Sequence, residues 1–467
     1  MKKDVRLHTQ LSHPNGIPYV LVSRSINRHS DTRMRKYYQA ALLITAVVSL
    51  VSLLFYRHEY NRLRYVLEVF DYFGKPYPER IKTSCPNNSS KTKKVSLYLD
   101  EPLSAWQRLD DDLYVYSSYA TNSRIETISY GKLNNPNLDC NIFVEGLLTP
   151  LPGTFSFNTL GNTSDIPGKT AYRGYILICE FSENMLPVGV TYQPRDQILF
   201  NPNSPILTVK NQAKKLIHDG SALCVSPPLN VPISKADMIS FLNFHESIGI
   251  KHFIIYDYGI PYMFHREFKN LAEDSDLPWN FTYEVVSWNF PIREIHSNVI
   301  KNIIETDCLY RTFNRVMYAA TVSWEEYIVL KLHHIVSDLL ADYEKSRMSG
   351  NRYMVQTQTF CTQQRDDKQS TNATFIIFKK TFTSPNALDA NSLFINKPHE
   401  VLKGGKIKTF KAASKLIVLN RYVSCNEYNA NNIEANKFEP SILRFAAFMQ
   451  DSPIYKKFFS GKVSELD

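Results

Sequence analysis

Three acidic residues follow short apolar runs in the second half of the sequence, where they could take part in catalysis. Asp257 ends the run HFIIYD (252–257), and Glu325 and Glu326 follow the run RVMYAATV (315–322). Carboxylates at strand ends can hold Mn²⁺ or Mg²⁺, a Lewis acid that neutralises the charge developing on a departing diphosphate. This arrangement suggests a nucleotide-sugar transferase. The alternative is that the three acids only solvate the ends of their strands.

The segments that would position these acids alternate between helix and strand after residue 230. Ser234 and Asp237 form a helix-capping pair, His245 lies on the buried stripe of that helix, and Gly249 ends it. Periodicity predicts strands at 252–257, 281–288 and 315–322 and helices at 294–306 and 332–345. Strands that alternate with helices at this spacing are typical of a mainly parallel sheet, in which ligands bind at the carboxyl ends of the strands.

The preceding part of the chain has a different pattern. Between residues 95 and 230 the signals are mostly those of strands separated by turns, at 113–120, 175–181 and 197–201. The predicted fold class is therefore α/β, with a β-rich N-terminal part at 95–230 and a mainly parallel sheet in the domain at 231–467.

The charge of the chain is concentrated at its N-terminus. Eight basic and two acidic residues among residues 1–36 account for +6 of the formal net charge of +9. A nucleic-acid-binding protein concentrates basic residues on its folded part, so this distribution argues against nucleic acid as a partner.

Residues 37–56 form a predicted membrane anchor. The twenty residues from Tyr37 to Tyr56 contain no charge, and as a helix they would span roughly 30 Å, the thickness of the hydrocarbon core of a bilayer. The alternatives are a buried core helix and a cleaved signal peptide. The basic residues at 1–36 place that tail in the cytosol, and residues 57–94, rich in Pro, Ser, Asn and Lys near their end, form a predicted stem. The sequence therefore predicts one transmembrane helix in a bilayer and a luminal C-terminal domain.

Glycosylation sequons and cysteines agree with a luminal domain, because all of them follow the predicted span. All seven cysteines do so, and some should pair in an oxidising lumen, although the sequence does not give the pairing. Five asparagines begin an N-x-S/T sequon: Asn87, Asn88, Asn162, Asn280 and Asn372.

Several segments, in order, resemble those of glycosyltransferase family 92. They are LYVYSSYA (113–120), ISKADMISFLNFHESIGIKHFIIYDYG (233–259), YEVVSWNFP (283–291), ETDCLYR (305–311), WEEYIVL (324–330) and NSLFINKPHEV (391–401). The resemblance covers about 110–430. It implies a GT-A-like nucleotide-sugar-binding domain in a type II Golgi membrane protein that uses a UDP-sugar, commonly UDP-galactose, and a divalent metal ion, with inversion at the anomeric carbon.

The resemblance also implies roles for single residues. Asp257 matches the acid after the first strand, near the nucleotide, and His245, Asp307 and Arg311 match further positions of the donor site. Each of the last three also has a structural explanation: His245 as a core histidine, Asp307 as a cap and Arg311 as a member of an ion pair.

The chain departs from the family at the metal site. The family's Asp-x-Asp-Glu motif is replaced by Ser323-Trp324-Glu325-Glu326, and no histidine stands in the later stretch Gly404-Gly405-Lys406-Ile407-Lys408. Near 419–422 the chain reads Leu-Asn-Arg-Tyr instead of a His-Tyr-Arg run. Loss of two ligands predicts weak Mn²⁺ binding by Ser323 and Glu325, and Lys406 or Lys408 could offset phosphate charge instead.

Two functions of different classes follow from these patterns. The first is a Golgi glycosyltransferase that moves a hexose from a UDP-sugar to a glycan acceptor, with Glu326 as the predicted catalytic base. The second is an inactive relative that binds glycans or a partner protein. If the first holds, Asp257, Glu325 and Lys406 should converge on one cleft.

Overall fold

The computed structural model describes residues 42–52 and most of 106–459. The chain divides into two compact units, residues 1–90 and 91–467, and every labelled element belongs to the second. The segments inside 106–459 that the structure does not describe are 111, 122, 133–135, 146, 148, 161–171, 183–184, 196–203, 212–219, 229–232, 274–280, 292–296, 368–372, 374, 384–391 and 426–436.

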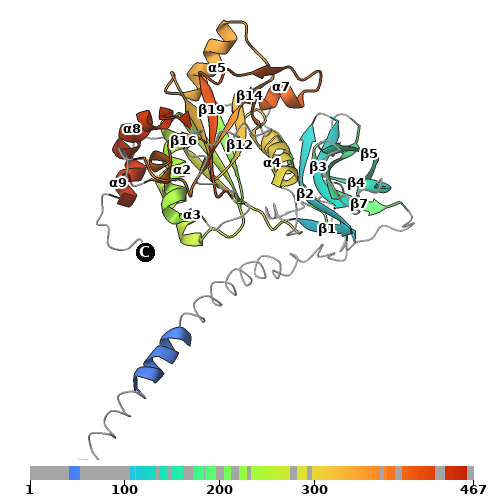
Figure 1. The fold of residues 1–467 in the computed structure, drawn as a ribbon. Coiled ribbons are helices and arrows are strands. Elements are labelled where there is room, and N and C mark those ends of the chain that lie inside the picture. Colours follow the sequence, from blue (N-terminus) through green and yellow to red (C-terminus); the bar gives the residue numbers. More distant parts are fainter. Residues whose placement is uncertain are drawn as a thin grey trace, which may run out of the picture. The chain divides into compact units, whose positions relative to one another are not determined.

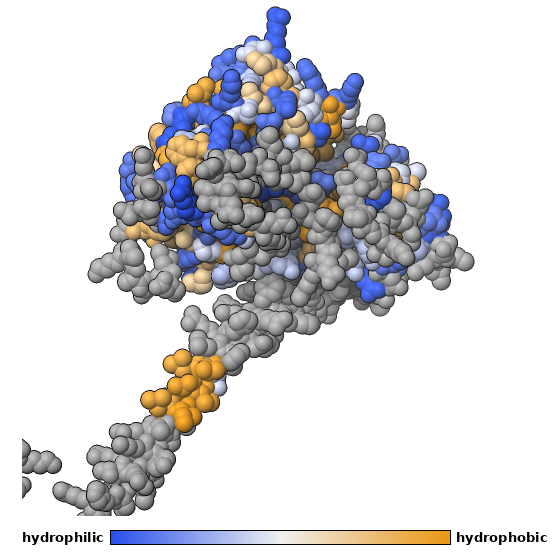
Figure 2. Space-filling model, viewed as in Figure 1, coloured by the Kyte–Doolittle hydropathy of each residue, from blue (hydrophilic) through white to orange (hydrophobic). Residues whose placement is uncertain are grey.

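Residues 42–52 form a helix with an apolar surface (Figure 2). Its residues Leu42 and Leu43 are 69% and 67% exposed. Among the residues that the structure describes, however, no helix is both long enough and apolar enough to cross a membrane. The predicted ends of the span, Tyr37 and Tyr56, lie outside the described residues, as do the predicted tail and stem.

Residues 107–211 form a closed sheet (Figure 1). Seven strands follow one another in the order β2-β3-β6-β5-β4-β7-β8, and a parallel pairing of β8 with β2 closes the ring, while β1 pairs with β2 alone. The other pairings within the ring are antiparallel. The bounds are β1 (Gln107–Asp110), β2 (Leu113–Thr121), β3 (Arg124–Lys132), β4 (Leu138–Val144), β5 (Leu151–Leu160), β6 (Tyr172–Glu180), β7 (Pro187–Pro194) and β8 (Leu207–Asn211).

A disulfide crosses the interior of this ring. Cys140 on β4 is bonded to Cys179 on β6, and β5 lies between these two strands. The bridge passes over Gly153 of β5, where an added Cβ would come within 2.4 Å of the Cys179 sulfur. Only glycine leaves room for the bridge at this position.

The second large sheet, which we call the mixed sheet, has seven strands in the order β11-β10-β9-β12-β17-β14-β18. The first four strands run parallel, and β17 is antiparallel to both of its neighbours. Runs rich in Ile, Val and Phe, such as IKHFIIYD in β10, favour buried strands of this kind. The bounds are β9 (Ser221–Ser226), β10 (Ile250–Asp257), β11 (Thr282–Ser287), β12 (Tyr318–Ser323), β14 (Arg352–Val355), β17 (Leu393–Asn396) and β18 (Thr409–Lys411).

The structure confirms the helices that were predicted from hydrophobic periodicity, as α2, α4 and α5. In α2 the Ser234 hydroxyl accepts the N–H of Asp237 at 3.1 Å, and Gly249, with φ +90°, follows the end of the helix. The bounds are α2 (Lys235–Ser247), α3 (Tyr262–Glu273), α4 (Ser297–Thr312), α5 (Val336–Lys345), α6 (Ile376–Lys379), α7 (Pro398–Leu402), η3 (Ser441–Phe445), α8 (Ala446–Asp451) and α9 (Pro453–Phe459).

Two smaller sheets complete the fold. The first joins β13 antiparallel to β19 and β19 parallel to β15, and the second pairs β16 with β20. Because β13 begins only three residues after β12 ends, the chain passes directly from the large sheet to this small one. The bounds are β13 (Glu326–Leu330), β15 (Thr357–Cys361), β19 (Ile417–Val423), β16 (Phe382–Thr383) and β20 (Lys437–Phe438).

The closed sheet packs against the mixed sheet through buried aromatic side chains. Trp106 and Tyr116 on the side of the closed sheet share one apolar cluster with Tyr256 and Trp288 on the side of the mixed sheet. The helix α4 contacts strands of both sheets (Figure 1). This packing makes α4 the element that links the two halves of the second unit.

The predicted fold class, a GT-A-like domain with a mainly parallel central sheet, is wrong. Strands predominate over helices among the described residues. Of their seventeen strand pairings, eleven are antiparallel and six are parallel. The physical reason is that hairpins build most of the closed sheet, and that β17 enters the second large sheet antiparallel to both of its neighbours.

Disulfides join distant parts of the second unit. Cys224 on β9 is bonded to Cys308 on α4, and Cys361 on β15 is bonded to Cys425. Together with Cys140–Cys179 inside the ring, these two disulfides account for every cysteine after residue 85. The seventh, Cys85, and the sequon residues Asn87, Asn88, Asn162, Asn280 and Asn372 all lie outside the described residues.

Candidate functional site

The predicted acids after β10 and β12 lie at the same edge of the mixed sheet. Ser323 at the end of β12 pairs with Ser226 at the end of β9, and on the other side of β9 the strand β10 continues to Asp257. One strand therefore separates Asp257 from Glu325, a backbone distance of roughly 10 Å at the usual strand spacing. Carboxyl ends of parallel strands form the usual ligand-binding edge of such sheets.

Asp257 caps the turn after β10. Its Oδ1 accepts hydrogen bonds from the backbone N–H groups of Gly259 and Ile260, both at 2.8 Å. Its Oδ2 lies 3.4 Å from Nε2 of His265, whose Nδ1 is 2.8 Å from the hydroxyl of Tyr283. Asp257 therefore holds the turn at the carboxyl edge, and one of its oxygens already accepts two backbone N–H groups.

Glu326 is held by two cations. Its Oε2 accepts hydrogen bonds from Nζ of Lys301 at 3.0 Å and from the backbone N–H of Ser323 at 2.9 Å. Its Oε1 accepts from Nε and Nη2 of Arg421 at 3.0 and 2.6 Å. Lys301 comes from α4, and Arg421 is the cross-strand partner of Glu326 in the pairing of β19 with β13. We call Lys301, Glu326 and Arg421 the charged trio.

The charged trio places its acid inside and its cations toward solvent. The Glu326 side chain is 2% exposed, whereas those of Lys301 and Arg421 are 24% and 18% exposed. Burial alone would raise the pKa of Glu326, but the charges of Lys301 and Arg421 outweigh burial and lower it. Glu326 is therefore a stable anion and a weak base.

Two further carboxyl groups lie close to the charged trio. Burial raises the pKa of Glu325, and a hydrogen bond with Ser323 opposes that effect only in part. Burial likewise raises the pKa of Glu305, which accepts a hydrogen bond from Asn396 at 2.9 Å. Of the acids at this edge, Glu325 has the environment that suits a general base, because its affinity for a proton is increased.

The predicted Mn²⁺ does not fit this edge. Both oxygens of Glu326 are already bound to cations, and Ser323 brings a hydroxyl where a carboxylate would be needed. In the described part of the chain, no group of three or more His, Cys, Asp or Glu side chains could hold a metal ion. A cation at this position would also meet the positive charges of Lys301 and Arg421.

Asp307 and Arg311, predicted to bind the donor, lie within the packing between the two sheets. Asp307 is fully buried and accepts hydrogen bonds from the hydroxyls of Tyr119 at 2.7 Å and Tyr256 at 2.6 Å, and from Ser117. Nε of Arg311 also donates to Asp307 at 2.5 Å. Burial alone would raise the pKa of Asp307, but Arg311 and these donors lower it. The pair therefore forms an internal network that joins α4, β10 and the closed sheet.

His245 is a core residue of α2. It is 0% exposed, its Nδ1 lies 2.9 Å from the carbonyl of Phe241, and its Nε2 accepts the backbone N–H of Ile328 at 3.3 Å. Burial lowers the pKa of His245 to about 3. The ring is therefore neutral and ties α2 to β13.

The predicted phosphate-binding lysines lie at the opposite edge. Strand register aligns Thr409, the first residue of β18, with His252 near the start of β10 through the intervening strands. Asp257 is five residues farther along β10, which corresponds to about 17 Å. Lys408, and Lys406 before it, are exposed where β18 begins. Lys406 therefore does not converge with Asp257 at the carboxyl edge.

The two cations that lie at this edge, Lys301 and Arg421, were not predicted from the sequence. Arg421 belongs to the Leu-Asn-Arg-Tyr segment that departs from the family pattern, but no local pattern indicates that it pairs with Glu326. Lys301 lies inside a predicted helix without any local signal. Both depend on pairings between residues far apart in the chain, and local periodicity does not contain that information.

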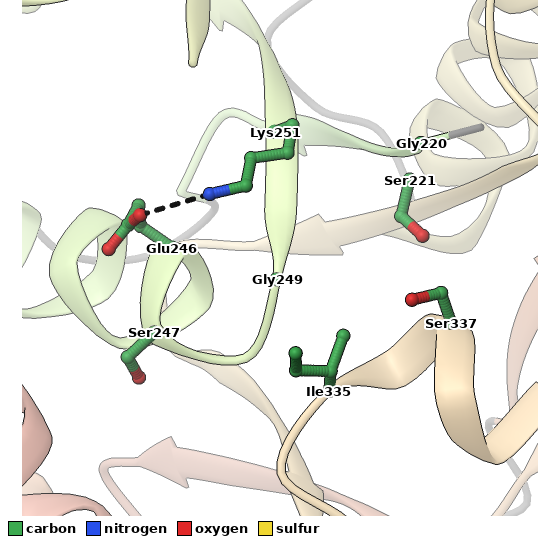
Figure 3. Close-up of a pocket in the computed structure, with 8 residues that line it drawn as sticks. All are labelled: Gly220, Ser221, Glu246, Ser247, Gly249, Lys251, Ile335 and Ser337. Carbon is green, nitrogen blue, oxygen red and sulfur yellow. Dashed lines mark hydrogen bonds and ion pairs between the residues drawn. The ribbon is translucent and has the colours of Figure 1, made fainter. Parts of the chain in front are cut away.

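A pocket of about 370 Å³ lies at the amino edge of the same sheet (Figure 3). Residues at the starts of β9, β10 and α5 line this pocket. Its lining also includes the ion pair of Lys251 with Glu246 at 3.3 Å. Ser221 points into it, and its buried hydroxyl has no hydrogen-bond partner among the described residues. None of the predicted site residues lines this pocket, so it is separate from the carboxyl edge.

Comparisons with known proteins assign no family. No protein-family model matches the chain, and no curated protein matches it. Among solved structures, the chain is similar to the crystal structure of a UDP-glucose pyrophosphorylase complexed with UDP-glucose, at 9% identity over 50% of this chain and 100% of that chain. The TM-score is 0.21, too low for the likeness to support an argument about fold or function.

Proposed function

We propose that the carboxyl edge of β9, β10 and β12 binds the diphosphate of a UDP-sugar, and that the protein transfers a hexose, with galactose as the first candidate, to a glycan acceptor. The observation that carries this proposal is the charged trio, which brings two cations to the ligand-binding edge of a parallel set of strands. The resemblance of the sequence to a glycosyltransferase family supplies the substrate class.

The reaction would be a single displacement with inversion. The acceptor hydroxyl attacks the anomeric carbon, its proton passes to a carboxylate, and the bond to the UDP oxygen breaks, with both electrons leaving on UDP. Glu325 suits the base better than the predicted Glu326, because burial raises the pKa of Glu325 while two cations hold Glu326 as an anion.

A transfer assay with the full-length protein tests this function. Radiolabelled UDP-galactose and a panel of glycan acceptors should give a labelled glycan, and Glu325→Gln should lower turnover by about a hundredfold or more while UDP affinity stays unchanged. Glu246→Gln, from the amino edge, is the matched control and should retain turnover. Full turnover by Glu325→Gln would remove Glu325 from the reaction.

Two observations favour the alternative of an inactive glycan-binding or partner protein. Both oxygens of the predicted base Glu326 are occupied by Lys301 and Arg421, and the predicted metal ligands do not form a site. If the full-length protein binds glycans but neither binds nor hydrolyses any UDP-sugar, this alternative replaces the transferase.

We further propose that the protein works in an oxidising compartment of the secretory pathway, with the Golgi lumen as the first candidate. Three disulfides, Cys140–Cys179, Cys224–Cys308 and Cys361–Cys425, support this placement, because such bonds form and persist in oxidising compartments. Fluorescence microscopy of the tagged protein against Golgi markers tests it, and a cytosolic signal would contradict it.

A further inference from the structure

We propose that the pocket at the amino edge of the mixed sheet is a second binding site, which takes a neutral, polyhydroxylated ligand: one sugar unit of a glycan. The residues that line it lie around the starts of β9, β10 and α5 (Figure 3). The carboxyl edge lies at the other end of β9 and β10, so this inference holds whether or not the protein transfers a hexose.

The pocket is larger than a single bridging water requires. Its volume is about 370 Å³, whereas one water molecule in the liquid takes up roughly 30 Å³. Small-molecule sites in proteins have volumes of about 300–1,000 Å³. The pocket therefore has the size of a site for one small ligand.

The hydroxyl of Ser221 is the observation that points to a ligand. Ser221 is 3% exposed, its side chain is directed into the pocket, and its hydroxyl has no hydrogen-bond partner among the described residues (Figure 3). A buried polar group without a partner lowers the stability of a protein. A ligand hydroxyl that bonds to Ser221 would take the place of water and remove this penalty.

The wall formed by α5 offers further polar groups and an apolar surface. The side chains of Ser337 and Ser221 point into the same space (Figure 3), and each hydroxyl can both donate and accept a hydrogen bond. The backbone N–H of Ser337 has no acceptor within α5, because it lies in the first turn, and the N-cap residue Ile335 makes no side-chain cap. Ile335 adds apolar surface to the pocket. A sugar ring matches this mixture, because it presents both hydroxyls and C–H groups.

The balance of charge favours a neutral ligand over an anion. Among the described residues that line the pocket, Lys251 is the one cation and Glu246 the one anion, and they form an ion pair at 3.3 Å. Asp338 lies in the first turn of α5, where its carboxylate weakens the attraction of the helix N-terminus for another anion. The lining therefore provides hydrogen bonds without selecting for a charge.

The walls of the pocket are held in place without a ligand. Ser221 belongs to β9, which lies between β10 and β12 in the mixed sheet. The backbone N–H of Val336 donates to the carbonyl of Ile248 at 3.0 Å and so joins the start of α5 to the turn before β10. At Gly249 in that turn, an added Cβ would lie 2.6 Å from Cγ2 of Ile335, so the two segments are in close contact. A ligand would bind to these walls without the entropic cost of ordering them.

Saturation-transfer NMR of the full-length protein with galactose, glucose and mannose, each added alone, tests the inference. At least one of these sugars should bind to the wild-type protein. Ser221→Ala and Ser337→Ala should each weaken that binding about threefold to tenfold, the usual effect of losing one neutral hydrogen bond. Because the hydroxyl of Ser221 has no partner within the described protein, Ser221→Ala should not lower the free energy of unfolding in urea.

Thr191→Val is the matched control. Thr191 is fully buried and its hydroxyl likewise has no partner among the described residues, but it lies on β7 of the closed sheet and does not line the pocket. Sugar affinity should be unchanged in this variant. Neither saturating UDP nor inorganic phosphate should displace the sugar, because UDP is expected at the opposite edge and the pocket does not select for an anion.

The outcomes separate this inference from the proposed function. The inference is overturned, and the UDP-sugar site left in place, if none of the three sugars binds, if neither serine substitution weakens binding, or if phosphate displaces the sugar. Displacement by UDP also overturns it, because the sugar would then lie at the carboxyl edge. A loss of stability in Ser221→Ala would show that the hydroxyl has a partner in the protein and would overturn the role given to it. Sugar binding that depends on both serines, in a protein that does not bind UDP, would support this inference and reject the proposed function.

Discussion

Replacing His245 with asparagine should change how the free energy of unfolding depends on pH. The imidazole is fully buried and burial lowers its pKa to about 3, whereas a histidine in the unfolded chain titrates near about 6.5. Between these values the unfolded chain binds one more proton than the native protein. The stability that the neutral ring contributes is therefore complete above about pH 6.5 and is lost as the pH falls toward about 3.

The magnitude follows from the size of the shift. Each pH unit inside this window costs the wild-type protein about 1.4 kcal/mol, so acidification from pH 6.5 to 4.5 should remove about 3 kcal/mol through His245 alone. His245→Asn loses the hydrogen bond from Ile328 and the stacking on Tyr327, and should be less stable at pH 7 by about 2–3 kcal/mol. The gap between the two proteins should therefore nearly close by pH 4.5.

Urea unfolding followed by tryptophan fluorescence at a series of pH values measures this gap. Phe244→Leu is the matched control, because it removes a fully buried, non-titrating side chain from the same helix and should keep a constant gap to the wild-type protein. A constant gap for His245→Asn as well would refute the reasoning. It would mean that the native ring accepts a proton as easily as the unfolded one and is not held neutral in the core.

Two further perturbations address the links between the halves of the second unit. Asp307→Asn removes the buried carboxylate that Nε of Arg311 contacts at 2.5 Å and leaves Arg311 with the more distant carboxylate of Glu284 at 3.6 Å, so urea unfolding should show a loss of about 3–5 kcal/mol; an unchanged free energy of unfolding would contradict a structural role for the network. The double substitution Cys224→Ser and Cys308→Ser opens a bridge with a sequence separation of 84 and should cost about 4 kcal/mol by the same measurement, whereas a stability equal to that of the wild-type protein would indicate that the cysteines are not bonded.

The elements of the mixed sheet could be predicted from the sequence because their signals are local. The cap at Ser234, the stop at Gly249 and the apolar run that ends at Asp257 each lie within one helical turn or one strand, and the structure confirms these elements. The expected strands at 281–288 and 315–322 appear as β11 and β12 with shifted ends.

The pairing of distant strands could not be predicted in the same way. Closure of the first sheet depends on β2 meeting β8, and the antiparallel return depends on β17 meeting β12, contacts that no local pattern encodes. The same limitation explains the candidate site. Asp257 and Glu325 were placed at one edge by the rule for parallel strands, but Lys301 and Arg421 reach Glu326 only through the tertiary fold.

The central claim is that the carboxyl edge of β9, β10 and β12 binds the diphosphate of a nucleotide sugar. Calorimetric titration of the full-length protein with UDP-galactose, once with Mn²⁺ and once with a chelator, tests it most directly. The charged trio predicts saturable binding of one UDP-galactose per chain with similar affinity in both conditions. Absence of binding in both would contradict the claim.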